Sequence, residues 1–407
     1  MTCRMSLIGR REFTGALAAL ATRPWRLNAA SGDMDTLLAA SVQRHGVPAA
    51  VFLTANSKEV TYTSTHGKRD SASDVKVGLD SIFAIASMTK AITTTAVMHM
   101  VEQGKLKLHE PAGRYLAELN NLQVIDGFDA GGKAKLRPAK RPVTLAHLIT
   151  HTSGFSYDTW SEEMAKFNAQ AGTPPPAKGP LVFDPGTRWQ YGNGTQWAGR
   201  VVEKVSGKSL EQYMQENILG RLGMADTSYI LPPEKLPRLV SVYRRQPDGM
   251  LKEDPRIQPP PPREYNGDGG LFCTAPDYAK FAQMILNNGR GVNGARILKP
   301  ATVALMKRNQ TGKIAAGVLK TQRPPLSDDV NFHPGAADRY TFGFLMNETA
   351  YNGGRSAGSL AWAGIYNTFY WIDPKRNLAG VAMMQFLPFV DKQAVAVLSD
   401  FEKAVYA

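Results

Sequence analysis

The stretch SIFAIASMTKAITTTAVMHM, residues 81–100, places a serine three residues before a lysine at the start of an apolar run. Residues i and i+3 share one face of a helix, so Ser87 and Lys90 are predicted to lie side by side. A serine becomes nucleophilic when a neighbouring base takes its proton, and a desolvated lysine is such a base. The helix N-terminus favours a developing anion. The alternative is a serine that begins a helix and an ordinary surface lysine.

The spacing alone does not identify a catalytic pair, because a chain of this length contains about one Ser-x-x-Lys by chance. A second copy, Ser73 and Lys76, lies in a polar segment beside glycine, with no apolar helix behind it. Ser87 instead stands between the apolar residues 82–86 and an apolar helix. The context therefore favours Ser87 over Ser73.

The segment Tyr191–Gly192–Asn193 is the only Y-x-N in the sequence, and it precedes a predicted helix. A turn before a helix directs a phenol and an amide into the same cleft. Neighbouring cations lower the pKa of a phenol from its usual value of about 10. Tyr191 near Lys90 would then act as a base toward Ser87, and Asn193 would orient the lysine or a substrate carbonyl. The alternative for Tyr191 is an ordinary half-buried tyrosine.

Five further phrases surround these motifs in a fixed order: LITHTSGF, PGTRWQYGN, GRLGMADTSY, GDGGLFCTAPDYAKFAQMILNNG and WIDPKRNLAGV. Together with Ser-x-x-Lys and Tyr-x-Asn, they resemble the serine β-lactamase and penicillin-binding protein superfamily, in the branch of the class C β-lactamases. The resemblance covers residues 35–400. It implies an α/β (α+β) fold, in which an antiparallel sheet flanked by helices and a mostly helical domain hold the active site between them.

The third motif of that superfamily, K-T-G, is absent from the sequence, as is K-S-G. Trp362–Ala363–Gly364 stands at the matching place. It is similar to the W-G-G or W-A-G of family VIII carboxylesterases, which the segment 125–142 also resembles. The K-T-G lysine helps to hold the carboxylate of β-lactams and peptidoglycan peptides. An apolar Trp362 in its place favours neutral short-chain or aryl esters; the alternative for Trp362 is core packing.

The resemblance also implies a role for each motif residue. Ser87 attacks the ester carbonyl, Lys90 and Tyr191 share its proton, and Tyr191 returns the proton to the leaving alcohol. The amides of Ser87 and Ile365 form the oxyanion hole. Gly364 lets the backbone pass close to a substrate. The residues expected to line the substrate pocket are Asn193, Trp362, Ala363 and Gly364.

The sequence thus predicts a serine carboxylesterase with a small-molecule ester substrate, no metal and no organic cofactor, and with weak β-lactam hydrolysis as a side activity. Three alternatives stay open. A β-lactamase or D-alanyl-D-alanine peptidase would use Arg355 to recognise a carboxylate. An acyltransferase would use another alcohol in place of water, and sequence does not separate it from an esterase. A binding protein on this fold would have lost catalysis.

Two histidines raise other chemistries. His147 and His151 are four residues apart and would share a helix face as metal ligands, but no third ligand is apparent nearby. We therefore expect both to be structural. The sequence has no G-x-S-x-G elbow, so a Ser-His-Asp triad is not expected.

Composition excludes several classes of protein. The 407 residues are 43% hydrophobic with a net charge of +13, which suits a large core or two packed domains. No apolar run reaches the ~18 residues of a membrane span. The two cysteines, Cys3 and Cys273, predict neither a Cys-rich metal site nor a structural disulfide. Basic residues cluster only at residues 133–141, without a nucleic-acid motif, so we expect a solvated loop rather than nucleic-acid binding.

The N-terminus and the distribution of predicted strands suggest the domain organisation. Arg10–Arg11, Phe13 and a short apolar run resemble a twin-arginine export signal, which favours a periplasmic location over a cytoplasmic leader at 1–30. Strand patterns gather at both ends of the chain, in hairpins around 56–58 and 367–385. We therefore expect an α/β domain from 31–95 and 265–407, with a helical domain inserted at 96–264.

Overall fold

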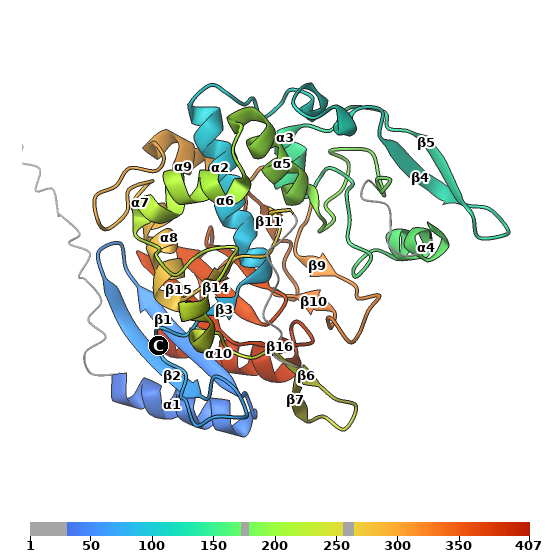
Figure 1. The fold of residues 1–407 in the computed structure, drawn as a ribbon. Coiled ribbons are helices and arrows are strands. Elements are labelled where there is room, and N and C mark those ends of the chain that lie inside the picture. Colours follow the sequence, from blue (N-terminus) through green and yellow to red (C-terminus); the bar gives the residue numbers. More distant parts are fainter. Residues whose placement is uncertain (1–30, 172–178, 255–263) are drawn as a thin grey trace, which may run out of the picture.

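A computed structural model describes residues 31–171, 179–254 and 264–407 of the chain. Figure 1 shows a sheet with helices on both sides and a largely helical region above it. The predicted export signal at 1–30 and Cys3 lie outside the described residues. Cys273 is a buried free thiol.

The main sheet has seven antiparallel strands in the order β11-β12-β13-β14-β15-β1-β2. Their bounds are Arg339–Tyr340 (β11), Leu345–Met346 (β12), Leu360–Gly364 (β13), Thr368–Asp373 (β14), Leu378–Met383 (β15), Ala49–Ala55 (β1) and Val60–Gly67 (β2). Leu53 of β1 pairs with Val381 of β15, so the two ends of the chain share one sheet. Both predicted hairpins, β1–β2 and β14–β15, are confirmed.

Both faces of this sheet are covered, as the alternation of side chains along β14 shows. Tyr370 stacks on Tyr278 of α8 (Ala275–Leu286), with ring centroids 4.8 Å apart. The next residue, Trp371, packs against Phe401 of α10 (Lys392–Tyr406) at 5.3 Å on the opposite face. Helix α1 (Ser31–Arg44) lies beside α10. The predicted antiparallel sheet flanked by helices is therefore confirmed.

Helix α2 (Thr89–Glu102) carries the Ser-x-x-Lys lysine and runs through the middle of the molecule (Figure 1). All its residues from Thr89 to Met100 are buried, because α5 (Gly194–Ser206), α6 (Leu210–Met214) and their neighbours surround it. A helix that is buried on every side needs few charged residues, and Lys90 is its only Lys, Arg, Asp or Glu before Glu102. The burial of Lys90 therefore calls for an explanation.

The other helices are α3 (Leu145–Ile149), α4 (Glu162–Ala171), α7 (Gly220–Leu222) and α9 (Pro300–Met306), with a π-helical turn at Gln215–Leu219 between α6 and α7. Short strand pairs complete the fold: β3 (Phe83–Ala84) with β8 (Phe272–Cys273), β9 (Val318–Leu319) with β10 (Val330–Asn331), β4 (Gln123–Phe128) with β5 (Ala134–Pro138), and β6 (Tyr243–Arg245) between β7 (Leu251–Glu253) and β16 (Phe386–Leu387). In the described part of the chain, no helix is long and apolar enough to cross a membrane.

The basic cluster lies on and just beyond the β4–β5 hairpin, which extends from the side of the molecule in Figure 1. Arg137 pairs with Asp126 and Asp184, while Lys133, Lys135, Lys140 and Arg141 are exposed. The cluster is thus a solvated surface.

The domain division stays a prediction; α2 runs without a break across its expected boundary at residue 95.

Candidate active site

Ser87 lies in a tight turn that leads from β3 into α2. The turn is a single 3₁₀ unit, Ala86–Met88. Ala86 has φ 41°, a left-handed conformation that is strained for a residue with a Cβ. Met88 is buried, whereas Ser87 is partly exposed. The strained turn therefore presents the Ser87 hydroxyl to a surface while the following helix remains in the core.

Lys90 is only 1% exposed, and three neighbours account for its ammonium hydrogens. Nζ donates to Ser87 Oγ at 3.1 Å, to Tyr157 Oη at 3.1 Å and to the backbone oxygen of Asp268 at 2.6 Å. The predicted contact between Ser87 and Lys90 is present. The lysine is held by a carbonyl, a hydroxyl and a phenol.

Tyr157 and Asp268 belong to this site, although sequence reasoning did not single them out. The Tyr157 phenol donates a short hydrogen bond to the Asp268 carboxylate. Burial, with the negative charge of Asp268 second, raises the pKa of Tyr157 well above its usual value, so this phenol stays neutral. Both residues lie in or next to sequence phrases that carry the family resemblance, which is the one feature that could have identified them. Tyr157 follows LITHTSGF by two residues, and Asp268 is inside GDGGLF.

Tyr191 meets Lys90 through its ring. The Lys90 Nζ lies 4.8 Å from the centre of the Tyr191 ring. The Tyr191 Oη accepts a hydrogen bond from Trp362 Nε1 at 3.3 Å. No hydrogen bond joins Tyr191 Oη to Ser87 or Lys90 among the described residues. The expected neighbourhood of Tyr191 and Lys90 is therefore present, with a geometry that sequence did not predict.

Trp362 is 6% exposed and lies within a cluster of aromatic rings. Its ring centre is 4.9 Å from Tyr191, 5.6 Å from Tyr340 and 6.4 Å from His151. The core-packing alternative therefore describes its surroundings, while its indole N–H keeps a direct link to Tyr191. Trp362 supports the site from behind Tyr191.

A cavity of about 370 Å³ opens at Ser87. Its lining comes from four separate segments of the chain: Ala84, Ala86, Ser87, Tyr157, Thr159, Trp160, Asn266, Asp268, Gly269, Gly270, Leu271, Phe272, Ile365 and Tyr366. None of these lining residues, within the described part of the chain, is lysine or arginine. Asp268 supplies the one acidic side chain of the wall.

The expected oxyanion pair, Ser87 and Ile365, lines the same cavity. Ser87 is the second residue of its helical turn, where helix geometry leaves the amide without an intrahelical acceptor. Ile365 follows the end of β13 at Gly364. A Cβ on Gly364 would stand 2.3 Å from the Ile85 carbonyl oxygen. The glycine therefore lets β13 approach the turn that carries Ser87. The group that passes close to Gly364 is the backbone of this turn, where a substrate was expected.

The residues expected to line the substrate pocket lie elsewhere. Asn193, Trp362, Ala363 and Gly364 are not part of the lining of the Ser87 cavity. Asn193 precedes α5, and its buried Oδ1 has no hydrogen-bond partner among the described residues. β13 directs Trp362 into the aromatic cluster, and loop residues such as Thr159, Trp160 and Tyr366 form the wall instead.

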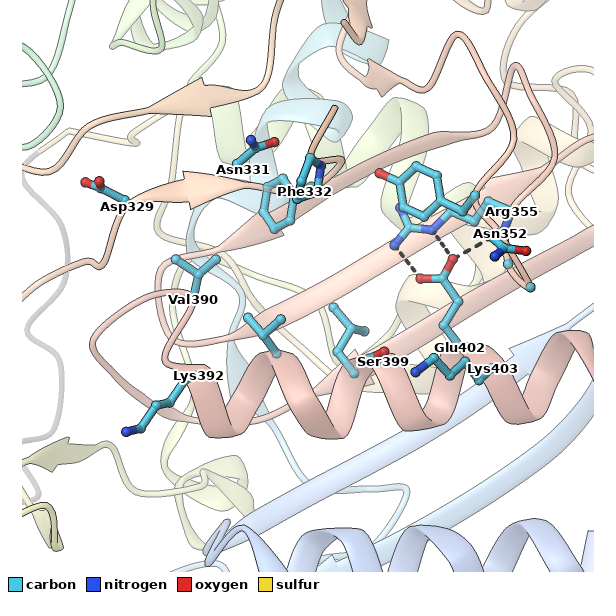
Figure 2. Close-up of a pocket in the computed structure, with 16 residues that line it drawn as sticks. Asp329, Asn331, Phe332, Asn352, Arg355, Val390, Lys392, Ser399, Glu402 and Lys403 are labelled. Carbon is cyan, nitrogen blue, oxygen red and sulfur yellow. Dashed lines mark hydrogen bonds and ion pairs between the residues drawn. The ribbon is translucent and has the colours of Figure 1, made fainter. Parts of the chain in front are cut away.

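The alternative that assigned carboxylate recognition to Arg355 is wrong. Arg355 is 8% exposed and forms a bidentate pair with Glu402 of α10, at 2.9 Å from Nε to Oε1 and 2.8 Å from Nη2 to Oε2 (Figure 2). It lies outside the lining of the Ser87 cavity. Its charge is therefore used in joining the loop before β13 to the last helix.

His147 and His151 each have a structural partner. The His147 Nδ1 accepts from the backbone N–H of Thr144 at 3.2 Å and completes a capping box at the start of α3. Burial lowers the pKa of His147 to about 4. His151 accepts from the Gly192 N–H at 3.4 Å, and burial and then the charge of Lys90 hold its pKa well below the usual value. The described ranges contain no cluster of three metal-ligating side chains.

Comparison with known proteins gives the same superfamily as the motifs of the sequence do. The family model described as Beta-lactamase matches residues 34–400. The chain is 31% identical to monacolin J acid methylbutanoyltransferase of Aspergillus terreus, over 92% of this chain and 95% of that protein. It is also 31% identical to lovastatin esterase of Penicillium rubens, over 92% and 98%. These relatives include both an acyltransferase and an esterase.

Solved structures agree on the fold. The LovD6 mutant of simvastatin synthase from Aspergillus terreus superposes with a TM-score of 0.81 at 29% identity, covering 93% of this chain and 95% of that one. EstCE1, described as a hydrolase with promiscuous acyltransferase activity, gives 0.73 at 19% identity, covering 93% and 99%, and supports the fold alone. Since the family match begins within α1 and ends within α10, it spans the whole described fold, and the chain belongs to the serine β-lactamase and penicillin-binding protein superfamily.

Proposed function

We propose that this protein is a serine acyl-transfer enzyme in which Ser87 takes an acyl group from a neutral ester and passes it to an alcohol, with water as the competing acceptor. The observation that carries the proposal is the hydrogen bond between Lys90 Nζ and Ser87 Oγ at the wall of a cavity. The similarity to a methylbutanoyltransferase favours an alcohol as acceptor, and the similarity to an esterase supports hydrolysis by the same acyl-enzyme.

In the proposed acylation, Lys90 first releases one proton. Ser87 Oγ then attacks the ester carbonyl carbon while its hydroxyl proton moves to the resulting amine. Lys90 is the direct acceptor because its Nζ contacts Oγ, whereas the Tyr157 phenol stays neutral and bonded to Asp268. Once protonated, Lys90 finds acceptors in the Asp268 carbonyl and Tyr157 Oη. These contacts stabilise the charged lysine while the tetrahedral intermediate exists.

Collapse of the tetrahedral intermediate breaks the bond from carbon to the leaving oxygen, which needs a proton. We assign that proton to Tyr191, which regains it from Lys90. The indole N–H of Trp362 and the lysine charge beside the ring stabilise negative charge on the Tyr191 oxygen in between. The amides of Ser87 and Ile365 are assigned to the carbonyl oxygen; one such donor contributes about 10²–10³-fold to the rate. An incoming alcohol or water then reverses these proton transfers and releases the acyl group.

The wall of the cavity favours neutral reactants. A β-lactam carries a carboxylate, and the lining offers neither lysine nor arginine among the described residues to receive it. The Asp268 carboxylate in the wall repels an anion further. A volume of about 370 Å³ is within the range of small-molecule sites. Neutral esters with short or aryl acyl groups are therefore the proposed donors.

The test is turnover of p-nitrophenyl butyrate in the presence and absence of a secondary alcohol such as cyclohexanol, with butyrate and cyclohexyl butyrate quantified separately. We expect both products, and a rising share of the new ester as alcohol is added. Ser87→Ala is expected to reduce turnover by about 10⁴-fold or more. Ser73→Ala, in the other Ser-x-x-Lys, is the matched control and should leave turnover unchanged.

Four outcomes would contradict the proposal. Turnover that survives Ser87→Ala would exclude Ser87 as nucleophile. A kcat/KM for a chromogenic cephalosporin above that for the ester would make the protein a β-lactamase. Absence of acylation by either substrate in mass spectra of the intact protein would indicate a binding protein on this fold. Butyrate as the sole product at every alcohol concentration would restrict the function to ester hydrolysis.

A further inference from the structure

A second cavity, of about 500 Å³, lies apart from the Ser87 site. It lies between α10, the segment 329–334 that contains β10, and the segment 351–355 that follows β12 (Figure 2). The two cavities have no lining residue in common. The proposed acyl transfer makes no use of it, so its occupant has to be inferred from its own walls.

The α10 wall of this cavity is polar at both ends and apolar in the middle. Lys392, Val395, Ser399 and Lys403 recur at helical spacing and therefore share one face. Val395 is 39% exposed, which is high for a branched apolar side chain beside a cavity, and Leu398 adds further apolar surface next to it. The wall therefore suits an elongated ligand with an apolar body.

The opposite wall continues the apolar middle. Phe332 lies across from α10, and Val390 lies at the end near Lys392 (Figure 2). Asn352 lies at the other end, with Glu402 and Lys403 (Figure 2). Small-molecule sites commonly have this form: an apolar cleft of roughly 300–1,000 Å³, with a few polar groups that fix the orientation of the ligand.

The charges of the cavity distinguish its two ends. Arg355 and Glu402 neutralise each other, and Asp329 is paired with Lys320. Lys392 lies within electrostatic reach of Asp328. The ammonium of Lys403 has no hydrogen-bond or ion-pair partner among the described residues. The end at Lys403 therefore carries an uncompensated positive charge, with the Ser399 hydroxyl one helical turn away.

We propose that this cavity binds an aliphatic carboxylate. The carboxylate accepts hydrogen bonds from Lys403, the Ser399 hydroxyl and the Asn352 amide, and the hydrocarbon chain lies over Leu398 and Val395 toward Phe332. The acyl donors and acids of the Ser87 site belong to a related class, but binding here does not depend on Ser87. The inference therefore stands or falls separately from the proposed function.

The experiment is isothermal titration calorimetry of the full-length protein with sodium octanoate, and with hexanoate and octan-1-ol for comparison. We expect saturable binding of octanoate, and weaker binding of hexanoate by about fourfold per methylene removed. Octan-1-ol, which lacks the charge, should bind at least about tenfold more weakly.

Variants on α10 locate the site. Lys403→Gln keeps a polar side chain, one atom shorter, and removes its charge, and should weaken octanoate binding by about tenfold or more. Val395→Trp fills the apolar middle and should abolish binding. Lys392→Gln, at the other end of the same face, is the matched control and should change the affinity by less than about twofold. Turnover of p-nitrophenyl butyrate should be unchanged in all three variants, which reports on their folding.

The proposal is overturned by any of three results. These are the absence of saturable octanoate binding at millimolar concentration, wild-type affinity in both Lys403→Gln and Val395→Trp, and octan-1-ol binding as tight as that of octanoate. The first result would show that no octanoate site exists. The second would show that octanoate binds elsewhere on the protein. The third would show that the carboxylate does not contribute to binding.

Discussion

Two buried cations in this protein have opposite surroundings. Arg355 faces a carboxylate and forms two hydrogen bonds with Glu402. Lys90 is more deeply buried, at 1% exposure against 8%, and donates to a carbonyl, a hydroxyl and a phenol. The Asp268 carboxylate is separated from this lysine by Tyr157, to which it is bonded.

The difference shows that burial alone does not distinguish a catalytic basic side chain from a structural one. A guanidinium with a bidentate carboxylate is a fixed ion pair, and its removal leaves the partner charged and buried. An amine that contacts only uncharged groups can gain or lose its proton, because no contacting carboxylate is then left buried without a partner. Arg355 is therefore suited to joining two segments, and Lys90 to moving a proton.

The sharpest test of this contrast is Lys90→Met. Loss of the proton acceptor should reduce the rate of acylation by about 10²–10⁴-fold, the range of a general base. Stopped-flow measurement of the nitrophenolate burst with p-nitrophenyl butyrate gives this rate directly. Lys76→Met, the lysine of the other Ser-x-x-Lys, should leave it unchanged. A near-normal burst in Lys90→Met would mean that another group accepts the Ser87 proton.

Arg355→Met should show the reverse pattern. The buried Glu402 carboxylate would lose its partner, and the free energy of unfolding should fall by about 3–5 kcal/mol. The kcat of the folded enzyme should not change. Urea denaturation measures the first quantity and ester turnover the second. The double variant Arg355→Met/Glu402→Gln should recover much of the stability; if it does not, the pair contributes through packing rather than charge.

The two tyrosines divide the proposed proton path. Tyr191→Phe removes the assigned donor to the leaving oxygen and should lower kcat by about 10²-fold. Tyr157→Phe removes one acceptor from Lys90 and the hydrogen bond to Asp268, and should lower kcat by about tenfold with KM nearly constant. Steady-state kinetics with p-nitrophenyl butyrate compares them. A larger effect of Tyr157→Phe would reverse the two assignments.

The smallest expected effect concerns pH. Burial lowers the folded-state pKa of His151 and of His147, the latter to about 4, while the unfolded chain binds protons near the usual 6.5. Their contribution to stability is present above pH ~6.5 and is lost as the pH falls toward 4, with a slope of at most about 1.4 kcal/mol per pH unit for each histidine. Urea denaturation from pH 7.5 to 5 measures this slope.

The same measurement sharpens the comparison of the two cations. The charge of Lys90 is one cause of the lowered pKa of His151. Lys90→Met should therefore raise that pKa and flatten the slope, whereas Arg355→Met should leave the slope as it is. Equal slopes in all three proteins would show that burial alone keeps His151 neutral.

Sequence predicted those parts of the site that depend on local geometry. The contact of Ser87 with Lys90 follows from their spacing on one helical turn, and the β14–β15 hairpin follows from alternation of its side chains. Between α6 and α7 lies a π-helical turn at Gln215–Leu219, which hydrophobic periodicity does not reveal.

Tyr157, Asp268 and the walls of the two cavities were not predicted, because they come from loops whose positions depend on tertiary packing. Tyr157 reaches Lys90 from a loop 67 positions away, and Asp268 from one 178 positions away. The motif around Trp362 identified its neighbourhood correctly, but the direction of its side chain depends on which face of β13 meets Tyr191.

The pairing of β1 with β15 also sets an order on synthesis. Leu53 and Val381 are roughly 330 positions apart, so the sheet closes only after nearly the whole chain has left the ribosome, and such distant contacts form slowly. Ile365, the expected second amide of the oxyanion hole, arrives in the same late segment. A nascent chain that already contains Ser87 and Lys90 thus lacks one wall of the cavity. We therefore expect no acyl-transfer activity from the emerging polypeptide until its last strands are made.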